Sequence, residues 1–248
     1  MKQTKSWILA HPEAGLRAVE WSSYQKFCKA YLQGIALPHI LGSWEFYGRS
    51  FVVSEDVLIP RPETELMIEH GIMFLNEFGG KDQVADIGTG SGCVGVTLAL
   101  EAPWVRVIGT DLSLPAITVA RENATKFHVG KRMAFVQADL LISVHTKFDL
   151  ICANMPYIPT MELNELDLNE PQIALDGGLD GLQLIHRLIH NIHRWLSHGG
   201  RALLEFGAGQ AESIIAVIEE SNWKDVQIYQ DLAGIDRLVS LHRSEKRT

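Results

Sequence analysis

The amino-acid sequence predicts an α/β fold, with a mostly parallel sheet covered by helices on both faces. From residue 84 onward, short apolar runs of strand type alternate with helical patterns, and this alternation is typical of a parallel sheet. A glycine-rich turn at 88–92 joins the first of these strands to the first helix, and glycines let a bound molecule approach the main chain closely. The expected strands are 84–87, 105–110, 133–138 and 148–153, and the expected helices between them are 92–101 and 114–128.

The chain before residue 84 is expected to form a helix, a hairpin and a loop. Apolar side chains between residues 12 and 34 repeat at steps of three and four, which predicts a helix. The pair Gly48-Arg49 separates two strand-like runs, which favours a tight hairpin at 44–53. These elements precede the alternating pattern and are shorter than a domain.

Two prolines flank Arg61 and favour an extended loop over 57–65. The acidic residues that follow suit the first turn of a helix that runs to about residue 78. Arg61 is either a solvated loop charge or a group directed at a bound molecule, and its position between prolines leaves both interpretations open.

After residue 157 the pattern predicts a long irregular stretch and then the end of the sheet. Residues 158–179 lack periodicity, and loops of this length in a compact domain are often functional. The turn at Gly234 favours a hairpin, so we expect the sheet to end with one antiparallel strand. The remaining expected elements are helices at 180–196 and 208–221 and strands at 202–206, 225–230 and 237–242.

Three histidines form a stripe on the predicted helix 180–196. His186, His190 and His193 stand at spacings of four and three, which could bind a metal ion. No acid or cysteine joins them at that spacing, and histidines on exposed helix faces are common. We therefore expect no metal site.

Composition excludes several classes of protein. The chain has 248 residues and a net charge of −8, which disfavours a broad nucleic-acid surface, so we expect no nucleic-acid partner except indirectly. No apolar run reaches the roughly 18 residues of a membrane helix. Cys28, Cys93 and Cys152 are scattered without a C-x-x-C pair, which indicates a reducing compartment. We expect a cytoplasmic protein without membrane contact, with a helical segment at 1–37 and a main domain at 38–248.

The apolar run that begins at residue 148 ends abruptly at Asn154-Met155-Pro156-Tyr157. Ligands gather at the carboxyl ends of parallel strands, so these residues lie where chemistry is usually done. Asn154 offers an acceptor and two donors, and Pro156 holds the Met155 carbonyl in a set direction. Tyr157 offers a flat face. Together they could hold a planar –NH2 group, whereas the alternative is a strand-end turn with a packed tyrosine.

Acidic residues close the next two predicted strands. Asp111 follows the glycine turn by about 20 residues, where an acid in a βαβ unit accepts hydrogen bonds from ribose hydroxyls. Asp139 closes the third strand, and its carboxylate could accept from an adenine amino group with Leu140 against the ring. The alternative is that Asp139 only caps a turn.

Five segments occur in an order that resembles the HemK/PrmC family, the glutamine methyltransferases of peptide chain release factors. The resemblance covers about residues 34 to 243. Its most specific parts are the proline–arginine loop and the Leu-Asp-Gly-Gly loop. The segments are Ile59-Pro60-Arg61-Pro62-Glu63-Thr64-Glu65, Asp86–Gly92, Asn154–Tyr157, Glu170-Pro171 with Leu175-Asp176-Gly177-Gly178 and Asp180-Gly181-Leu182, and Leu204-Glu205-Phe206-Gly207.

The resemblance implies a Rossmann-like fold of seven mostly parallel strands that binds S-adenosyl-L-methionine (SAM). It implies methyl transfer to the glutamine amide in the Gly-Gly-Gln loop of a release factor. Asn154 and the Met155 carbonyl would hold that amide, with Tyr157 against it and with Pro156 and Arg61 beside it. The residues implied to contact SAM are Asp86, Gly88, Thr89, Gly90, Ser91, Gly92, Asp111, Asp139, Leu140 and Asn154.

The chain departs from the family pattern in two places. Met155 stands where the family has proline, and we expect the amino-terminal helical domain to be shorter than the family's. Two alternatives therefore stay open. One keeps the fold and changes the substrate to another planar amine, such as a ribosomal-protein glutamine or an adenine of RNA or DNA. The other is a SAM-binding relative that has lost catalysis.

Overall fold

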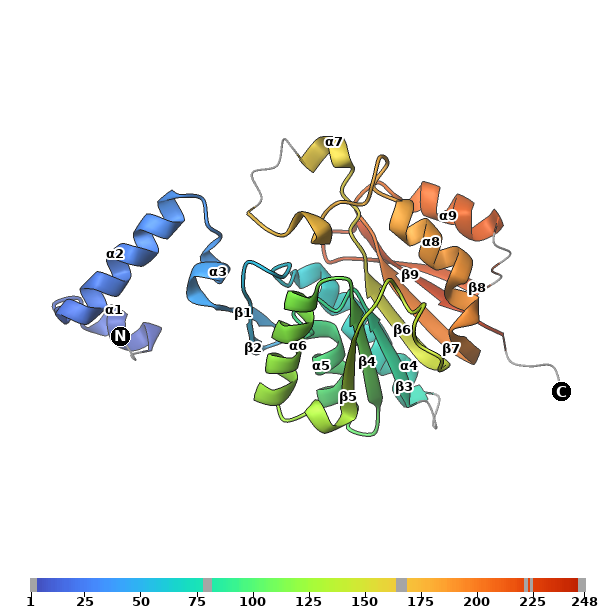
Figure 1. Cartoon of the computed structure of the whole chain (residues 1–248), viewed down its shortest axis with the longest axis horizontal. Helices are drawn as coiled ribbons and strands as arrows, with labels where there is room; N and C mark the ends of the chain where they lie inside the picture. The colour runs from blue at the N-terminus through green and yellow to red at the C-terminus, as the bar shows by residue number, and fades with distance from the viewer. Residues whose placement is uncertain (1–3, 78–81, 164–168, 221–222, 224, 245–248) are drawn as a thin grey trace.

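The structure, a computed structural model, describes residues 4–77, 82–163, 169–220, 223 and 225–244. Within these residues a seven-stranded sheet carries helices on both faces, beside a two-stranded hairpin (Figure 1). The strands are β1 (Ser43–Phe46), β2 (Arg49–Val52), β3 (Gln83–Ile87), β4 (Arg106–Asp111), β5 (Met133–Gln137), β6 (Phe148–Asn154), β7 (Leu196–Glu205), β8 (Asp225–Gln230) and β9 (Asp236–His242). The helices are α1 (Lys5–Ala10), α2 (Ala18–Leu32), α3 (Leu37–Leu41), α4 (Glu65–Glu77), α5 (Cys93–Glu101), α6 (Leu114–Lys126), α7 (Thr160–Leu163), α8 (Gln183–Asn191) and α9 (Ala211–Glu220).

The seven strands are ordered β5-β4-β3-β6-β7-β9-β8, which confirms the predicted α/β class. Strands β3 to β7 pair in parallel, and β9 is antiparallel to both β7 and β8. The predicted terminal hairpin is present, but its antiparallel strand does not form the edge of the sheet. After β7 the chain passes through α9 and places β8 at the outer edge, so the returning β9 fills the position beside β7.

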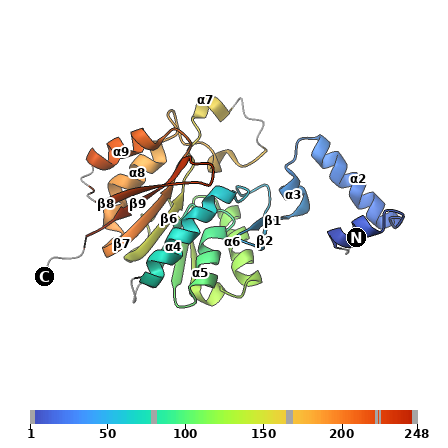
Figure 2. The same ribbon diagram turned by 180° about the vertical axis from the view of Figure 1, so that it is seen from behind.

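Each face of the sheet has its own apolar core, because alternate strand residues point to opposite faces. On one face α4 and α5 pack on Val84, Leu150 and Leu203. On the other face α8 and α9 pack on residues one position along, such as Ala85 and Ile151. Viewed from behind, Figure 2 shows α4 lying across the sheet, with α8 and α9 on the far side.

The hairpin of β1 and β2 is fixed to the main sheet by a buried asparagine. The Asn123 side chain in α6 accepts a hydrogen bond from the Val52 N–H at 2.8 Å and donates to the Val52 carbonyl at 2.9 Å. It also donates to the Ser91 carbonyl at 2.8 Å. One amide therefore holds the hairpin, α6 and the glycine turn together, as a buried polar group with all its partners can.

Several element boundaries differ from the prediction near Gly181 and Gly199. The predicted helix 180–196 begins only at Gln183, since Gly181 has a φ of 75° and the Asp180 carboxylate accepts from the Leu182 N–H. The same helix ends at Asn191, and the predicted strand 202–206 begins earlier, at Leu196. Helix α9 begins at Ala211, and its predicted end at 221 lies outside the described residues, as does the predicted end of α4 at 78.

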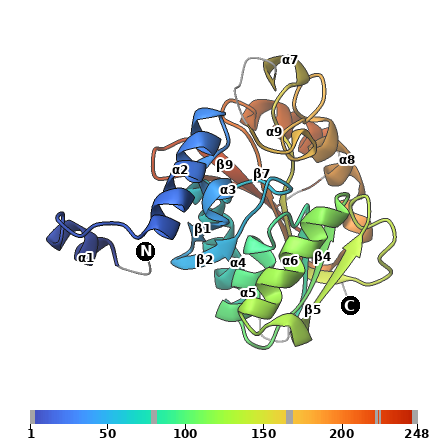
Figure 3. The same ribbon diagram turned by 60° about the vertical axis from the view of Figure 1, so that its left-hand side comes forward.

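The amino-terminal segment stands apart from the sheet. Figures 1 and 2 show α1 and α2 beside the main body rather than against it, and Figure 3 shows α1 clear of the body in a third view. The helix predicted over 12–34 is α2, and none of its residues is buried. Helix α1 was not expected from the sequence. The division at residue 37 stays a prediction, although α3 already lies against β1. Within the described residues no helix is long and apolar enough to cross a membrane.

Candidate active site

Two cavities meet at the carboxyl ends of β3 and β6, where the sequence places most candidate residues. Both cavities are lined by Asn154, Gly88 and Gly90. The first extends over the ends of β4 and β5 and is lined by Val57, Leu58, Ile87, Asp111, Leu112, Ser113, Ala116, Ala138, Asp139, Leu140, Met155, Pro156 and Leu184 among others. The second runs under the proline–arginine loop and is lined by Pro60, Arg61, Thr64, Asp86, Thr89, Ser91, Cys93 and Val94 among others.

The glycine turn is held in shape from below by Asp86. One Asp86 carboxylate oxygen accepts from the Thr89 hydroxyl at 2.6 Å and from the Gly95 N–H at 2.9 Å. Burial raises the pKa of Asp86 to about 6. Gly92 begins α5 at a φ of 78°, and a Cβ there would lie 3.1 Å from the Ala120 Cβ. Asp86 thus supports the turn from inside and also lines the second cavity, and the cofactor contact that the resemblance implies for it stays a prediction.

Asp111 stands at the end of β4 and binds the turn from the side. One carboxylate oxygen accepts from the Gly90 N–H, and the other accepts from the Ser113 N–H, each at 2.9 Å. Burial raises the pKa of this carboxyl, and the backbone hydrogen bonds oppose that shift. The carboxylate lines the first cavity, and each oxygen retains a lone pair that can accept from a hydroxyl.

Asp139 and Leu140 form the far wall of the first cavity. Leu140 is buried with a φ of 52°, a left-handed conformation that branched side chains rarely adopt and that is concentrated at functional sites. Asp139 pairs with Arg187 of α8 at 2.7 Å. A half-exposed ion pair of this kind is weak, so a ligand can compete for the carboxylate.

Asn154 ends β6 with its side-chain amide between the two cavities. Its Nδ2 donates to the Thr64 hydroxyl at 3.1 Å. Asn154 is the register partner of Glu205 in β7, so both side chains lie on the face of the sheet that carries α4. Thr64 and Glu205 are each only 2% exposed. The inward side of Asn154 is therefore a buried polar cluster.

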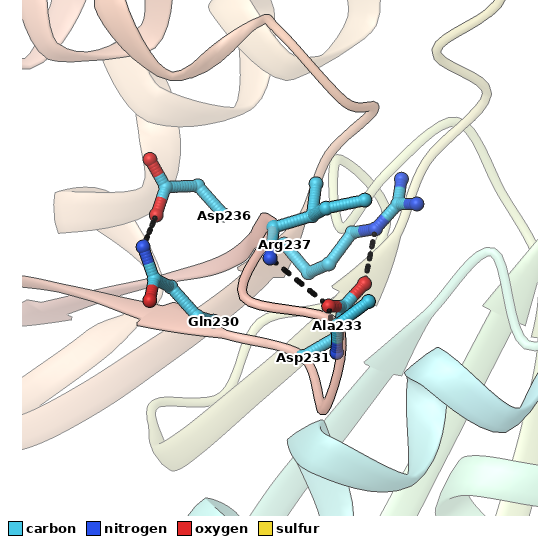
Figure 4. Close-up of polar contacts among 6 residues, drawn as sticks. Gln230, Asp231, Ala233, Asp236 and Arg237 are labelled. Carbon is cyan, nitrogen blue, oxygen red and sulfur yellow. Dashed lines mark hydrogen bonds and ion pairs between the residues drawn. The ribbon is translucent and has the colours of Figure 1, made fainter.

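Glu205 is a buried carboxyl with a raised pKa and one oxygen that lacks a hydrogen-bond partner among the described atoms. Burial raises the pKa of its carboxyl to about 7, and hydrogen bonds from the Thr64 and Asn154 side chains act in the opposite direction. Its Oε2 is buried without a hydrogen-bond partner among the described atoms. Arg237 of β9 opposes the rise, but its Nε is paired with Asp231 at 3.0 Å in the β8–β9 turn (Figure 4).

The residues after Asn154 lie beside both cavities. Met155 is 8% exposed, and its Sδ would lie 3.7 Å from a Cβ at Gly88, so its side chain fills space next to the glycine turn. Burial raises the pKa of Tyr157 to about 12, which keeps its hydroxyl neutral. The Tyr157 carbonyl accepts from the Gln210 side chain at 2.8 Å, so the tetrapeptide is anchored to the segment before α9.

Arg61 is partly exposed, and its charge is paired within the protein. It forms an ion pair with Glu170, whose side chain is 4% exposed, and the same carboxylate accepts from the Ile59 N–H at 2.8 Å. The long segment after Tyr157 thus holds the proline–arginine loop over the second cavity. The Leu-Asp-Gly-Gly segment within it is packed tightly, because a Cβ at Gly177 would lie 2.4 Å from the Gly181 carbonyl oxygen.

The three histidines of the predicted stripe do not share one helix, since His186 and His190 lie in α8 and His193 lies in the 3-10 turn that follows it. The His190 ring bonds the His186 carbonyl of its own helix at 2.8 Å. Across the part of the chain that the structure describes, no three His, Cys, Asp or Glu side chains come together as a possible metal site.

The first cavity fits SAM on three counts. Its glycine wall lets a ligand reach the main chain, its apolar side chains suit an adenine ring, and Asp111 can accept from ribose hydroxyls. None of the described residues that line it is Lys or Arg, which disfavours a phosphate-bearing cofactor and suits the positive sulfonium of SAM. The fold and this site define a SAM-dependent methyltransferase.

Comparisons with known proteins show which family of methyltransferases the chain belongs to. The family model described as "Methyltransferase small domain" matches residues 64–169. A release factor glutamine methyltransferase of Neisseria gonorrhoeae is 42% identical over 84% of this chain and 77% of its own. Its counterpart in Bradyrhizobium diazoefficiens is 36% identical over 95% of this chain and 82% of its own. The chain belongs to the family of release factor glutamine methyltransferases.

A solved structure supports the fold independently. A methyltransferase from Pyrococcus furiosus superposes with a TM-score of 0.58 at 18% identity, and the match covers 88% of this chain and 98% of that one. At this identity the likeness concerns the fold alone.

Sequence reasoning gave no role to Thr64 or Glu205. Both lie in segments that carry the family resemblance, and Glu205 follows an apolar strand as Asp111 and Asp139 do. An acid at the end of each strand is therefore the pattern that could have found Glu205. Its pairing with Asn154 depends on the strand order, which the sequence does not display.

Proposed function

We propose that this chain transfers a methyl group from SAM to the side-chain amide of a glutamine in a peptide chain release factor, within the Gly-Gly-Gln loop. The observation that carries the proposal is the position of Asn154 between the two cavities, with its amide nitrogen turned inward to Thr64. Its oxygen is thereby available to a planar –NH2 group. Family membership supports the choice of glutamine and of the release factor.

In this proposal the first cavity binds the cofactor. Asp111 accepts from ribose hydroxyls, Leu140 packs on the adenine ring with Asp139 at its edge, and the turn from Gly88 to Gly92 contacts the methionine part. When bound, SAM supplies an electrophilic methyl group. Thr89 and Ser91 are buried within the turn, so they act by shaping it, as Asp86 does.

The chain's own residues position the substrate amide. An amide nitrogen is a poor nucleophile because its lone pair is delocalised into the carbonyl, so close and aligned placement is required. Asn154 Oδ1 and the Met155 carbonyl accept the two amide hydrogens, and Tyr157 packs on the plane of the group. These acceptors stabilise the positive charge that develops on nitrogen during transfer. The amide then releases one proton to solvent. Pro156 restrains this tetrapeptide, and Arg61 with Glu170 holds the loop above it.

The test is turnover on a release factor with labelled SAM, followed by mass mapping of the modified residue. We expect one methyl group on the glutamine of the Gly-Gly-Gln loop and none on a Gln→Ala release factor. Asn154→Ala is expected to lower kcat by roughly 10²-fold or more while SAM still binds. Methylation of a different protein, or of an adenine-containing RNA in place of the release factor, would replace this substrate with another planar amine. Binding of SAM without transfer to any of these substrates would indicate that catalysis has been lost.

A further inference from the structure

Resting on the proposed function, we propose that Glu205 and Thr64 are positioning residues that fix the orientation of the Asn154 amide, so that only its oxygen faces the substrate. An asparagine amide is nearly symmetric in shape, and rotating it by half a turn exchanges an acceptor for a donor. If the nitrogen faced the substrate –NH2, two donors would meet and the site could not hold the amide. Something must therefore select one orientation.

The selection follows from the polarity of the buried cluster. An ionised Glu205 carboxylate can only accept hydrogen bonds, so the Thr64 hydroxyl must donate to it. The Thr64 oxygen then has only lone pairs to offer, so it must accept from Asn154 Nδ2, as the 3.1 Å contact shows. Asn154 lies beside Glu205 in register and acts on its pKa as a hydrogen-bond partner, so we assign the second hydrogen of Asn154 Nδ2 to the Glu205 carboxylate. Both nitrogen hydrogens are thus used inside the protein.

The fold places these three groups together for a reason visible in the topology. Asn154 and Glu205 end adjacent parallel strands in register, and both point to the α4 face. Thr64 closes the short 3-10 turn at Pro62–Thr64 that leads into α4 above them. A buried carboxyl with one oxygen unpartnered is costly in a fold, and such groups are concentrated at functional sites. A role in substrate orientation accounts for its retention here.

We call the hydrogen bonds from Asn154 to Thr64 and from Thr64 to Glu205 the relay. Their donor-to-acceptor direction depends on the ionisation of Glu205. The pKa of Glu205 is raised to about 7, so the carboxyl gains a proton near neutral pH and can itself donate a hydrogen bond. Thr64 is then no longer forced to accept from Asn154, and the amide orientation is no longer fixed. The charged and titratable groups around it are Glu63 and Arg61 of the proline–arginine loop, Tyr157 after β6, Arg237 of β9 and Cys93 of α5. Tyr157 and Cys93 stay neutral at this pH, since burial raises both of their pKa values to about 12.

The first experiment separates the hydroxyl of Thr64 from its shape. Thr64→Val keeps the volume and removes the hydroxyl, and we expect kcat to fall by roughly 10²-fold with SAM affinity by calorimetry unchanged. Thr64→Ser restores the hydroxyl and should restore kcat. The matched control is Thr97→Val in α5, a fully buried threonine whose hydroxyl has no partner among the described atoms and which lies outside both cavities.

The second experiment removes the charge of Glu205. In the parent, kcat should rise as pH increases through about 7, whereas Glu205→Gln should be slower and flat across the same range. Parent-like kcat in both Thr64→Val and Glu205→Gln would overturn the inference, even if the release factor is confirmed as the substrate.

A third readout needs no substrate. In the ¹⁵N-labelled protein the Asn154 side-chain –NH2 signal, assigned through its loss in Asn154→Ala, should show proximity to the Thr64 methyl group. The signal should shift in Glu205→Gln and remain in place in Thr97→Val. If this contact is present but no release factor is methylated, the proposed function is wrong and the relay stands. If the contact is absent, the relay is wrong whatever the substrate.

Discussion

Helices α2 and α5 are both expected from the sequence, and they end in opposite environments. Helix α5 is apolar almost throughout and is buried from Cys93 to Ala99, whereas α2 spaces its apolar side chains among polar and charged ones and has no buried residue. Leu98 of α5 is fully covered, whereas Leu32 of α2 is 84% exposed. The neighbours differ as well, because α5 packs against the sheet and α4, whereas α3 is the main neighbour of α2 among the described residues. Apolar spacing indicates a helix, and tertiary contacts decide what it stabilises.

Carboxylates in the two regions differ in the same way. Glu20 of α2 accepts from the Arg17 guanidinium and N–H, and its pKa is lowered to about 2. Glu205 at the sheet edge has its pKa raised to about 7 by burial. The exposed Glu20 has a partner that stabilises its charge, whereas burial of Glu205 makes its charge costly, and the proposed role in orienting Asn154 gives that cost a reason.

The sharpest test of this comparison truncates one leucine in each helix. Leu98→Ala should lower the free energy of unfolding by about 2–5 kcal/mol, because it leaves a cavity in the core. Leu32→Ala, the matched control, should change it by no more than about 0.5 kcal/mol. Urea unfolding followed by circular dichroism measures both. A large loss for Leu32→Ala would mean that α2 is covered in solution and would break the comparison.

The buried carboxyl gives the next largest effect, as a pH dependence of stability. The folded pKa of Glu205 is about 7 and its ordinary value is 4.5, so the folded state holds a proton that the unfolded state releases between these values. Its contribution to stability is therefore present below about pH 4.5 and is lost as pH rises to about 7, by about 3 kcal/mol in total. Glu205→Gln should remove this loss. Unfolding curves of the two proteins that stay parallel with pH would contradict the buried charge.

A smaller effect, on SAM affinity, is expected for Asp111 at the carboxyl end of β4. Asp111→Ala removes an acceptor for ribose hydroxyls, and each hydrogen bond to a charged group is worth about 1.5–3 kcal/mol. It also releases the Gly90 and Ser113 N–H groups, so the turn loses a support. We expect weaker SAM binding by calorimetry, whereas Leu32→Ala should bind as the parent does. Unchanged affinity in Asp111→Ala would exclude Asp111 from the cofactor site.

The smallest change in activity and stability is expected for Met155→Pro, which introduces the proline of the family pattern. Proline fixes φ and leaves the carbonyl in place, a gain of about 0.4–1 kcal/mol where the geometry is compatible. The buried methionine side chain beside Gly88 is lost, so packing offsets that gain. We expect stability and kcat/KM close to the parent values. A clear fall in kcat/KM with unchanged SAM affinity would show that the methionine side chain shapes the substrate pocket.

The sequence by itself determined the order and type of most elements in the main domain. Apolar runs that stop at Asp111, Asp139 and Asn154 place their polar ends on one edge of a parallel sheet, because parallel strands share a direction. The glycine turn before α5 needs positive φ, which the glycines themselves reveal. These features are local, so composition and spacing are enough to find them.

Only the tertiary structure decided which of these groups meet. The strand order sets Glu205 beside Asn154, the proline–arginine loop brings Thr64 over both, and the late segment brings Glu170 to Arg61. The same holds for β9, which lies inside the sheet rather than at its edge. Each contact joins residues from distant parts of the chain, and its existence depends on packing and loop closure rather than on local pattern. Spacing along the sequence therefore located the parts of the site, and the fold decided how they are paired.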